Sequence, residues 1–426
     1  MADQFEDLVR TGPGTPMGQL MRQYWIPAAL SAELVPDGAP MRLMLLGEKL
    51  VAFRDSTGRV GIMDHRCPHR CASLFFGRNE ANGLRCVYHG WKYDVDGNCV
   101  DMANVPAHQD FKTKVHARAY ATAERSGLIW VFMGDPARMP ALPPFEACLL
   151  PQDQIEYRFV QRRCNWLQAI EGDLDTSHLG FLHFGAARPS TELDTSSRNL
   201  VVNRAPEYKV TDTDFGLSYG AYRPADGGGV YWRTAHLLFP FWVMPPIARI
   251  EDNIMVRAFV PLDDEHCMFV GIAHKDYLRE NRARKPLPGG TLIDRVHPST
   301  TDWLGRFRMV EAEENDYFID RDVQREQSFT GIEGIHVQDQ AITESMGAMV
   351  DRGLETLAPS DIAVVRARRL LQRTLAAFTA GKRPPAADQP ELYANLRGGY
   401  YTSPKTDDWL AQQKAMVARA SPLTVA

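Results

Sequence analysis

Short hydrophobic runs, separated by turn residues, follow one another between Met41 and about Val131. The runs occupy residues 42–55, 58–67, 86–100 and 127–134, with turn signals such as Ser56-Thr57-Gly58 and Asp96-Gly97-Asn98. Runs of this length, broken by glycine, asparagine and aspartate, are typical of antiparallel strands joined by tight turns. The pattern predicts a small antiparallel β domain.

The rest of the chain mixes strand and helix patterns. Residues 247–262 and 266–277 are expected to be strands. The clearest helix begins at Ser360-Asp361, an N-cap and a first-turn acid, and its apolar face is predicted at Ile362, Val365, Leu370, Leu371 and Leu375. We interpret its basic residues as a solvated face: Arg366, Arg368, Arg369 and Arg373.

These patterns predict an α+β fold with two domains. Residues 1–40, interrupted by Gly12-Pro13-Gly14, are expected to form an irregular lead-in that packs on the larger domain. The small β domain is predicted at residues 41–138. The proline-rich stretch from Met139 to Phe145 then leads into the larger domain, predicted at residues 139–426.

The composition narrows the possible classes of protein. With 426 residues, 44% of them hydrophobic, the chain can bury a sizeable core, which excludes disorder and a disulfide-stapled miniprotein. A formal net charge of −5 gives no electrostatic case for nucleic acid or an anionic membrane. The longest apolar stretch, 237–247, is too short and proline-rich to span a bilayer, and the N-terminus lacks a secretory signal. We therefore expect a cytoplasmic protein.

Cysteine and histidine give the first chemical signal. Four of the seven cysteines lie between Cys67 and Cys99. In a reducing compartment such a cluster favours a metal site or buried thiols over disulfides. Cys67 and His69 are followed, after sixteen intervening residues, by Cys86 and His89. Two thiolates and two imidazoles on two turns could hold one metal centre.

Two kinds of centre fit these four residues. Structural zinc favours four-coordinate cysteine and histidine sites, and zinc fingers usually pair Cys with Cys and His with His. In a Rieske 2Fe–2S cluster, two cysteines hold one iron and two histidines hold the other. Each loop here supplies one Cys and one His, as a cluster spanning two irons requires. The spacing favours the Rieske cluster, and Cys71 and Cys99 are interpreted as packed thiols.

A second candidate site lies within NWLQAIEGDLDTSHLGFLHF, residues 165–184. It contains Asp175, His178 and His183. On a regular helix the five-residue step would turn His183 roughly 140° away from His178. Both histidines can reach one metal only if the helix is distorted or ends between them, and Gly180 is a natural place for that break.

Together, these motifs resemble a known family. CPHRCASL and CVYHGWKYDVDGNC resemble the two loops of Rieske proteins, and with the second motif the chain is similar to the α subunit of Rieske non-haem iron aromatic-ring-hydroxylating oxygenases. The stretch from Tyr317 to Asp361, which contains HVQDQAITESMG, resembles the branch of phthalate 4,5-dioxygenase and phenoxybenzoate dioxygenase. The resemblance implies an antiparallel sheet surrounded by helices in the larger, catalytic domain.

The resemblance also implies the cofactors and their ligands. Each subunit would carry one Rieske 2Fe–2S cluster and one mononuclear Fe(II), the latter held by His178, His183 and a later carboxylate. Asp339 matches best, five residues before Glu344, with Asp316 and Glu333 as rivals. A 2-His-1-carboxylate set leaves open positions for dioxygen.

The family also assigns roles to subunits and partners. Asp175 would bridge His178 and His89 of a neighbouring subunit, which implies a homotrimer or a hexamer. The sequence lacks a dinucleotide-binding G-x-G-x-x-G between a strand and a helix, so a separate flavin and iron–sulfur reductase is implied. Arg66, Arg70, Arg85 and Lys92 are candidates for docking an acidic partner.

The implied reaction is cis-dihydroxylation of a phthalate-like or phenoxybenzoate-like aromatic acid by O2. O-demethylation of a methoxylated aromatic acid at the same iron is the alternative. For the substrate we predict three contact residues from the region of the aromatic run TAHLLFPFWVMPP, namely Arg233 for a carboxylate, His236 as a hydrogen-bond donor and Phe241 for the ring.

Overall fold

Two antiparallel sheets build the smaller region of the molecule. The computed structural model describes residues 2–187, 193, 195–276, 295–404 and 408–420. The first sheet has the order β1-β10-β9-β4-β3-β2, and the second has the order β5-β6-β7-β8. Their strands are β1 (Trp25–Leu30), β2 (Met41–Leu45), β3 (Glu48–Arg54), β4 (Val60–Asp64), β5 (Arg78–Asn79), β6 (Leu84–Arg85), β7 (Trp91–Tyr93), β8 (Cys99–Met102), β9 (Ala119–Arg125) and β10 (Leu128–Phe132).

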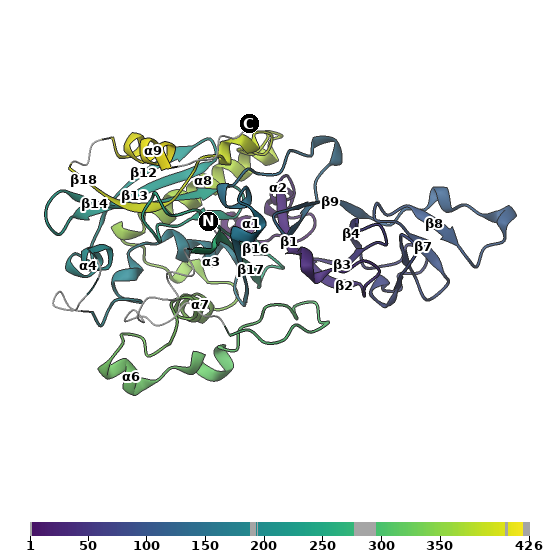
Figure 1. Cartoon of the computed structure of the whole chain (residues 1–426), viewed down its shortest axis with the longest axis horizontal. Coiled ribbons are helices and arrows are strands. Elements are labelled where there is room, and N and C mark those ends of the chain that lie inside the picture. Colours follow the sequence, from purple (N-terminus) through teal and green to yellow (C-terminus); the bar gives the residue numbers. More distant parts are fainter. Residues whose placement is uncertain (1, 188–192, 194, 277–294, 405–407, 421–426) are drawn as a thin grey trace.

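A separate hydrophobic core holds the two small sheets together. It contains Val51 and Phe53 of β3, Met63 of β4, and Leu84 and Tyr93 of the second sheet. Because these side chains come from both sheets, burying them fixes the β5–β8 sheet against the first one. Figure 1 shows the β7–β8 end of this region standing away from the rest of the molecule.

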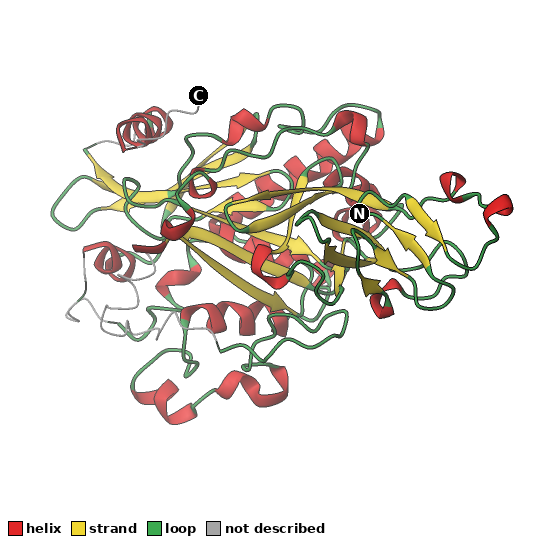
Figure 2. Ribbon diagram, turned by 45° about the vertical axis from the view of Figure 1, so that its right-hand side comes forward, coloured by secondary structure: helices red, strands yellow, loops and turns green. Residues whose placement is uncertain are grey.

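The larger region is organised around an antiparallel sheet of order β11-β17-β16-β15-β14-β13-β12, with β18 paired to β14. Figure 2 shows these strands running through the middle of the region with helices around them. The strands are β11 (Ile155–Arg162), β12 (Glu207–Thr213), β13 (Gly216–Pro224), β14 (Val230–Leu238), β15 (Trp242–Met244), β16 (Met255–Pro261), β17 (Cys267–His274) and β18 (Gly399–Ser403). The α+β architecture expected from the sequence is confirmed.

Helices cover both faces of this sheet. The α-helices of the described residues are α1 (Ala2–Val9), α2 (Pro16–Met21), α3 (Trp166–Leu174), α4 (Thr195–Val202), α6 (Arg321–Glu326), α7 (Ile335–Ser345), α8 (Ile362–Thr379) and α9 (Trp409–Ala420), and not all of them contact the sheet. Helix α3 packs on β14, β15 and β16, while α7 and α8 pack on α3. Trp409 and Val417 of α9 pack with Trp232 of β14 in a different cluster. No helix in the described part of the chain has the length and apolar character that crossing a membrane requires.

Two expectations from the sequence need correction. The lead-in is not irregular, because it forms α1 and α2, which contact α8, and β1, which pairs with β10 of the small region. Arg368 of α8 is not solvated. It is buried and donates from Nε and Nη2 to the carboxylate of Glu171 on α3, at 2.7 and 2.8 Å. This bidentate pair joins α8 to α3. The domain limits at residues 40 and 138 stay a prediction.

Candidate metal centres

Two loops with the same backbone structure carry the first four candidate ligands. The loop after β4 contains Cys67 and His69, and the loop after β6 contains Cys86 and His89. In the first loop the Cys71 N–H donates to the Cys67 carbonyl at 2.8 Å, and in the second the Gly90 N–H donates to the Cys86 carbonyl at 2.9 Å. The sequence therefore folds into two matching turns, each presenting one thiol and one imidazole.

Each turn closes on a residue in the left-handed region. That residue is Gly90 in the second loop, with φ +77°, and Cys71 in the first, with φ +58°. A left-handed conformation costs a non-glycine residue about 1 kcal/mol or more. Cys71 is exposed, so the prediction that it is a packed thiol is wrong, whereas Cys99 is buried and burial raises its thiol pKa to about 11.

The four side chains fit a two-iron cluster. Cys67 and Cys86 are buried, and the rings of His69 and His89 lie with centroids 4.5 Å apart. Nδ1 of His89 is buried and has no hydrogen-bond partner, as an atom reserved for a metal would be. One thiol and one imidazole on each turn suit a cluster in which two cysteines hold one iron and two histidines hold the other.

Two aromatic residues that are not metal-ligand candidates support this centre. The ring of Trp91 stacks on His69 at 4.4 Å, and the hydroxyl of buried Tyr93 lies 3.3 Å from Cys67 Sγ. Both lie on β7 within the stretch CVYHGWKYDVDGNC, but the sequence analysis assigned neither of them a role. Hydrogen bonds to the sulfurs tune the potential of such clusters.

We expect Tyr93→Phe to lower the reduction potential of the cluster by about 60 mV. A hydroxyl hydrogen bond stabilises the more negative, reduced state, and a tenfold change in a one-electron equilibrium corresponds to about 59 mV. Redox titration followed by visible absorption measures this. Tyr88→Phe, at an exposed tyrosine of the same loop, is the control and should leave the potential unchanged. An unshifted Tyr93→Phe potential would contradict the assigned hydrogen bond.

Most of the predicted docking cations have partners within the chain. Arg85 pairs with Glu80 and Asp101, and Arg66 pairs with Asp64. Lys92 donates to the Ala81 carbonyl. The guanidinium of Arg70 lies 5.4 Å from the Tyr88 ring, beside His89. A docking role for these residues stays a prediction.

The second motif leaves its helix earlier than expected. Helix α3 ends at Leu174, and Asp175 is its C-cap, with its N–H bonded to the Glu171 carbonyl. A single 3-10 turn, His178–Gly180, follows. Gly180 ends that turn, as the sequence indicated, but the α-helix has already ended before Asp175. The break frees His178 and His183 from helical spacing.

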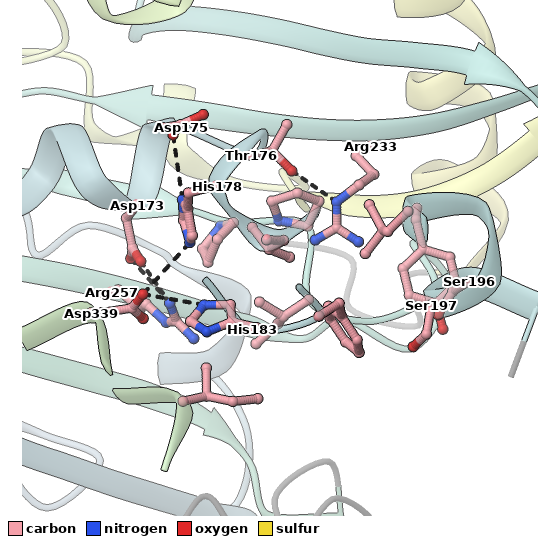
Figure 3. A pocket seen from close by; sticks show the side chains of 18 residues that line it. Asp173, Asp175, Thr176, His178, His183, Ser196, Ser197, Arg233, Arg257 and Asp339 are labelled. Atoms are coloured by element: carbon pink, nitrogen blue, oxygen red, sulfur yellow. Dashed lines mark hydrogen bonds and ion pairs between the residues drawn. The ribbon is translucent and has the colours of Figure 1, made fainter. Parts of the chain in front are cut away.

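His178, His183 and Asp339 converge, as Figure 3 shows. Asp339 comes from α7, and its Oδ1 lies 3.2 Å from His183 Nε2 and 3.5 Å from His178 Nε2. The ligand atoms of the three residues all lie within 4.8 Å of one another. Two imidazole nitrogens and a carboxylate oxygen at this spacing fit a single metal ion of the facial-triad type.

Partners on the far side of each ring orient the two histidines. Asp175 Oδ2 lies 3.5 Å from His178 Nδ1, and Gln338 Oε1 lies 2.8 Å from His183 Nδ1. Gln338 in turn donates to the Ile332 carbonyl at 2.7 Å, which fixes its amide. Both arrangements keep a proton on Nδ1. Nε2, the ring nitrogen nearest Asp339, is then the one available to bind a metal. Gln338 was not identified from the sequence, although it directly precedes Asp339.

The charges of this group are matched to one another. Burial acts to raise the pKa of Asp339, but the facing imidazoles of His183 and His178 outweigh it and hold that pKa well below its usual range. Burial likewise acts to lower the pKa of His178, but the hydrogen bond with Asp175 and the negative charges of Asp339, Asp175 and Asp173 together outweigh it, so the pKa is raised. Asp339 is therefore a carboxylate, ready to bind a cation.

The rival carboxylates lie elsewhere. Asp316 and Glu333 are exposed and do not join the converging group. Glu344 is buried and accepts hydrogen bonds from the Arg163 N–H at 2.7 Å and the Tyr317 hydroxyl at 2.6 Å. It therefore supports the start of α3 rather than the metal group.

A cavity of about 150 Å³ opens beside His178, His183 and Asp339. Its other walls come from α4, β14, β16 and the segment after β15, and include Ser196, Ser197, Leu200, Arg233, Pro245, Ile247 and Arg257. A void of this size accepts one benzene ring.

Two arginines line the cavity, and they differ in their partners. Arg257 Nη1 donates to both carboxylate oxygens of Asp173, at 2.9 and 3.1 Å. Arg233 is buried, and it donates to the Thr176 hydroxyl at 2.8 Å and to the Tyr231 hydroxyl at 3.4 Å. Within the described part of the chain no carboxylate pairs with Arg233. Its charge faces the cavity uncompensated (Figure 3).

The other two predicted substrate residues do not line this cavity. His236 lies three positions after Arg233 on β14, so it projects from the opposite face of the sheet. There it contacts Ser218 Oγ at 2.7 Å and Gln413 of α9 at 3.0 Å. Phe241 is fully buried in the main hydrophobic core. We correct both predictions: neither side chain reaches the cavity.

Comparison with known families agrees with this geometry. Residues 24–116 match the family model of the Rieske [2Fe-2S] domain. Residues 131–425 match the family model described as LigXa C-terminal domain like. The first covers both cysteine–histidine loops, and the second covers the three converging residues.

Individual proteins match over nearly the whole chain. The oxygenase subunit of 3-chlorobenzoate-3,4-dioxygenase from Comamonas testosteroni is 48% identical over 95% of each chain. The oxygenase subunit of phthalate 4,5-dioxygenase from Pseudomonas putida is 35% identical over 96% of this chain and 94% of its own. The crystal structure of dicamba monooxygenase bound to dicamba shares the fold, with a TM-score of 0.58 at 19% identity over 85% of this chain and all of its own. The chain therefore belongs to the oxygenase subunits of the Rieske non-haem iron oxygenases.

Proposed function

We propose that this chain is a terminal oxygenase that adds both atoms of dioxygen to a single-ring aromatic carboxylate, giving a cis-diol. The observation that carries the substrate class is the uncompensated guanidinium of Arg233 in a cavity of about 150 Å³. One ring fills such a space, and guanidinium binds carboxylate through two parallel hydrogen bonds. The similarity to a subunit named for 3-chlorobenzoate supports the same class.

We assign the metal groups to the residues that converge. Cys67 and Cys86 would hold one iron of the cluster, and His69 and His89 the other. A cluster with two imidazole ligands supplies single electrons at a raised potential. His178, His183 and Asp339 would hold the mononuclear iron, which supplies open positions for dioxygen.

The surrounding side chains then have distinct tasks. Asp175 keeps the proton of His178 on Nδ1, and Gln338 does the same for His183. Arg233 directs the carboxylate away from the metal residues and thereby turns the ring toward them. Leu200, Pro245 and Ile247 cover the ring and exclude water. Electrons come from a separate reductase, since the chain carries no dinucleotide-binding motif.

Electron transfer is proposed to cross between subunits. Figure 1 shows the β7–β8 sheet at the far end of the molecule from α3 and α7. A second cavity, on another side of the metal group, is lined by Asp175 and His178 and by Ile342, Met346 and Leu357, whose side chains are exposed. Its other lining residues include Glu355 and Asp361.

The cluster loops complement this surface. Val87 and Tyr88 are exposed beside His89, and the guanidinium of Arg70 lies over the Tyr88 ring. The exposed apolar pair Val87 and Tyr88 with the basic Arg70 on one copy thus suits the exposed apolar residues of the second cavity and its acid Asp361 on the next. A head-to-tail contact of this kind closes into a ring, and three copies make the smallest such ring. We therefore propose a homotrimer.

The function is tested by product analysis under ¹⁸O₂. The iron-loaded protein receives NADH, a phthalate-type reductase and a panel of benzoates, phthalates, phenoxybenzoates and methoxybenzoates. We expect a cis-diol carrying two labelled atoms from a benzoate. One labelled atom with release of formaldehyde would instead identify an O-demethylating monooxygenase and contradict the proposal.

The role of Arg233 is tested separately. We expect Arg233→Met to raise the KM for 3-chlorobenzoate about 10- to 100-fold, because a charge-assisted hydrogen bond is worth about 1.5–3 kcal/mol. Oxidation of chlorobenzene, which has no carboxylate, should change little. Arg249→Met, at an exposed arginine, is the control. Equal losses on both substrates would show that Arg233 supports the fold and does not recognise the carboxylate.

A further inference from the structure

The segment that carries the two metal histidines, residues 178–187, has little regular structure of its own. After the turn His178–Gly180, it continues through isolated bonds, such as those from the Leu182 N–H to the His178 carbonyl and from the Gly185 N–H to the Phe181 carbonyl. A short irregular segment leaves carbonyl groups pointing outward, and buried carbonyls require donors. The groups that donate hydrogen bonds to these carbonyls therefore help to fix the positions of the two imidazoles relative to each other.

One side chain supplies them. Arg204, between α4 and β12, donates from Nη1 to the Gly180 carbonyl. Its Nη2 donates to the Ala187 carbonyl at 2.9 Å and the Phe184 carbonyl at 3.4 Å. The guanidinium carbon also lies 5.2 Å from the centre of the Phe181 ring. The planar fork of an arginine suits this set of diverging acceptors, and a lysine ammonium cannot reproduce it.

The fit extends to the backbone of the segment. A Cβ added at Gly180 would lie 3.4 Å from Cβ and Cγ of Arg204, so the arginine stem lies directly against this glycine. On another side, the ring of Phe329 is so close that a Cβ on Gly185 would come within 2.3 Å of it. Arg204 thus packs against the segment at Gly180, and Phe329 packs against it at Gly185.

We propose that Arg204 is a positioning residue that sets the spacing of His178 and His183 and thereby the affinity of the mononuclear metal site. This inference rests on the proposed iron site. Arg204 contacts neither imidazole, and it acts through the carbonyls of the turn that carries them. It also lies two residues after the end of α4, and Ser196, Ser197 and Leu200 of α4 line the proposed substrate cavity. Arg204 therefore joins a wall of the cavity to the metal ligands.

Metal affinity tests the proposal without relying on turnover. The mononuclear metal is removed with a chelator that leaves the Rieske absorbance intact, and Co²⁺ is titrated back without oxygen. We expect Arg204→Ala to weaken Co²⁺ binding about 10- to 100-fold, the usual effect of losing a group that orients metal ligands, and Arg204→Lys to fall between. Hydrogen exchange of the amides from His178 to Ala187 should be faster in metal-free Arg204→Ala. Arg198→Ala, which removes an exposed α4 arginine paired with Asp226, should match the wild type in both.

The outcomes separate this inference from the iron site on which it depends. Wild-type affinity with wild-type exchange in Arg204→Ala would overturn the role of Arg204. A wild-type protein that takes up no Co²⁺ beside its cluster would overturn the iron site itself. If Arg204→Ala also loses the cluster absorbance, the Arg204→Lys variant is used instead. Weaker Co²⁺ binding by Arg204→Lys with an intact cluster would support the proposal, and unchanged Co²⁺ binding would overturn it.

Discussion

Replacing Asp339 by alanine is expected to remove the mononuclear iron and to reduce oxygenation at least about 100-fold, while the visible spectrum of the Rieske cluster persists. Asp339 Oδ1 is the atom that both imidazole Nε2 atoms face, at 3.2 and 3.5 Å. Without it, two neutral nitrogens remain and no anionic ligand balances the metal charge. The cluster is unaffected because its ligands lie on separate loops of the small region.

Iron analysis with visible spectroscopy measures this effect. The variant should contain one iron fewer per chain than the wild type at equal cluster absorbance. Asp316→Ala and Glu333→Ala are matched controls, since both carboxylates are exposed and outside the group, and they should keep the full iron content. An Asp339→Ala protein with wild-type iron and turnover would show that another residue provides the carboxylate.

Asp175→Asn should keep both metal centres but slow the oxidation of the reduced cluster about 10- to 100-fold in the presence of substrate and dioxygen. The carboxylate of Asp175 accepts from the Ser177 N–H at 2.7 Å and faces His178 Nδ1 at 3.5 Å. An amide nitrogen in place of Oδ2 would oppose the N–H of His178. The same residue lines the second cavity, where the neighbouring subunit is proposed to dock.

Stopped-flow absorption of the pre-reduced protein measures the cluster oxidation rate. Asp361→Asn serves as the control, because it alters another acid of the second cavity that does not contact a metal ligand. It should oxidise at the wild-type rate. Wild-type oxidation and turnover by Asp175→Asn would remove the bridging role from this residue.

The sequence was most informative where ligands are close together in the chain. Cys67, His69, Cys86 and His89 lie on two adjacent turns, so their spacing alone restricts the geometry they can adopt. Asp339 follows the histidines by more than 150 residues, and no local period links them. Its assignment depended on family resemblance, and only the packing of α7 against α3 explains why it lies there.

Some residues were misjudged although a local signal existed. Arg233 and His236 are three positions apart on one strand, which places them on opposite faces. Arg368 lies four positions after Val364 and three before Leu371, on the buried side of α8. For Gln338, Tyr93 and Arg204 the sequence does not show the partner, because their contacts form only when separate segments meet.

The central claim is that the cluster of one subunit passes electrons to the mononuclear iron of the next subunit. Mixed trimers test this claim most directly. Subunits with Cys67→Ser cannot hold the cluster, and subunits with Asp339→Ala cannot hold the mononuclear iron, so each homotrimer should be inactive. Co-expressed and purified as mixed trimers, they should regain a substantial share of wild-type turnover, because an intact cluster can face an intact iron across a subunit boundary. Mixed trimers as inactive as the two parents would contradict transfer between subunits.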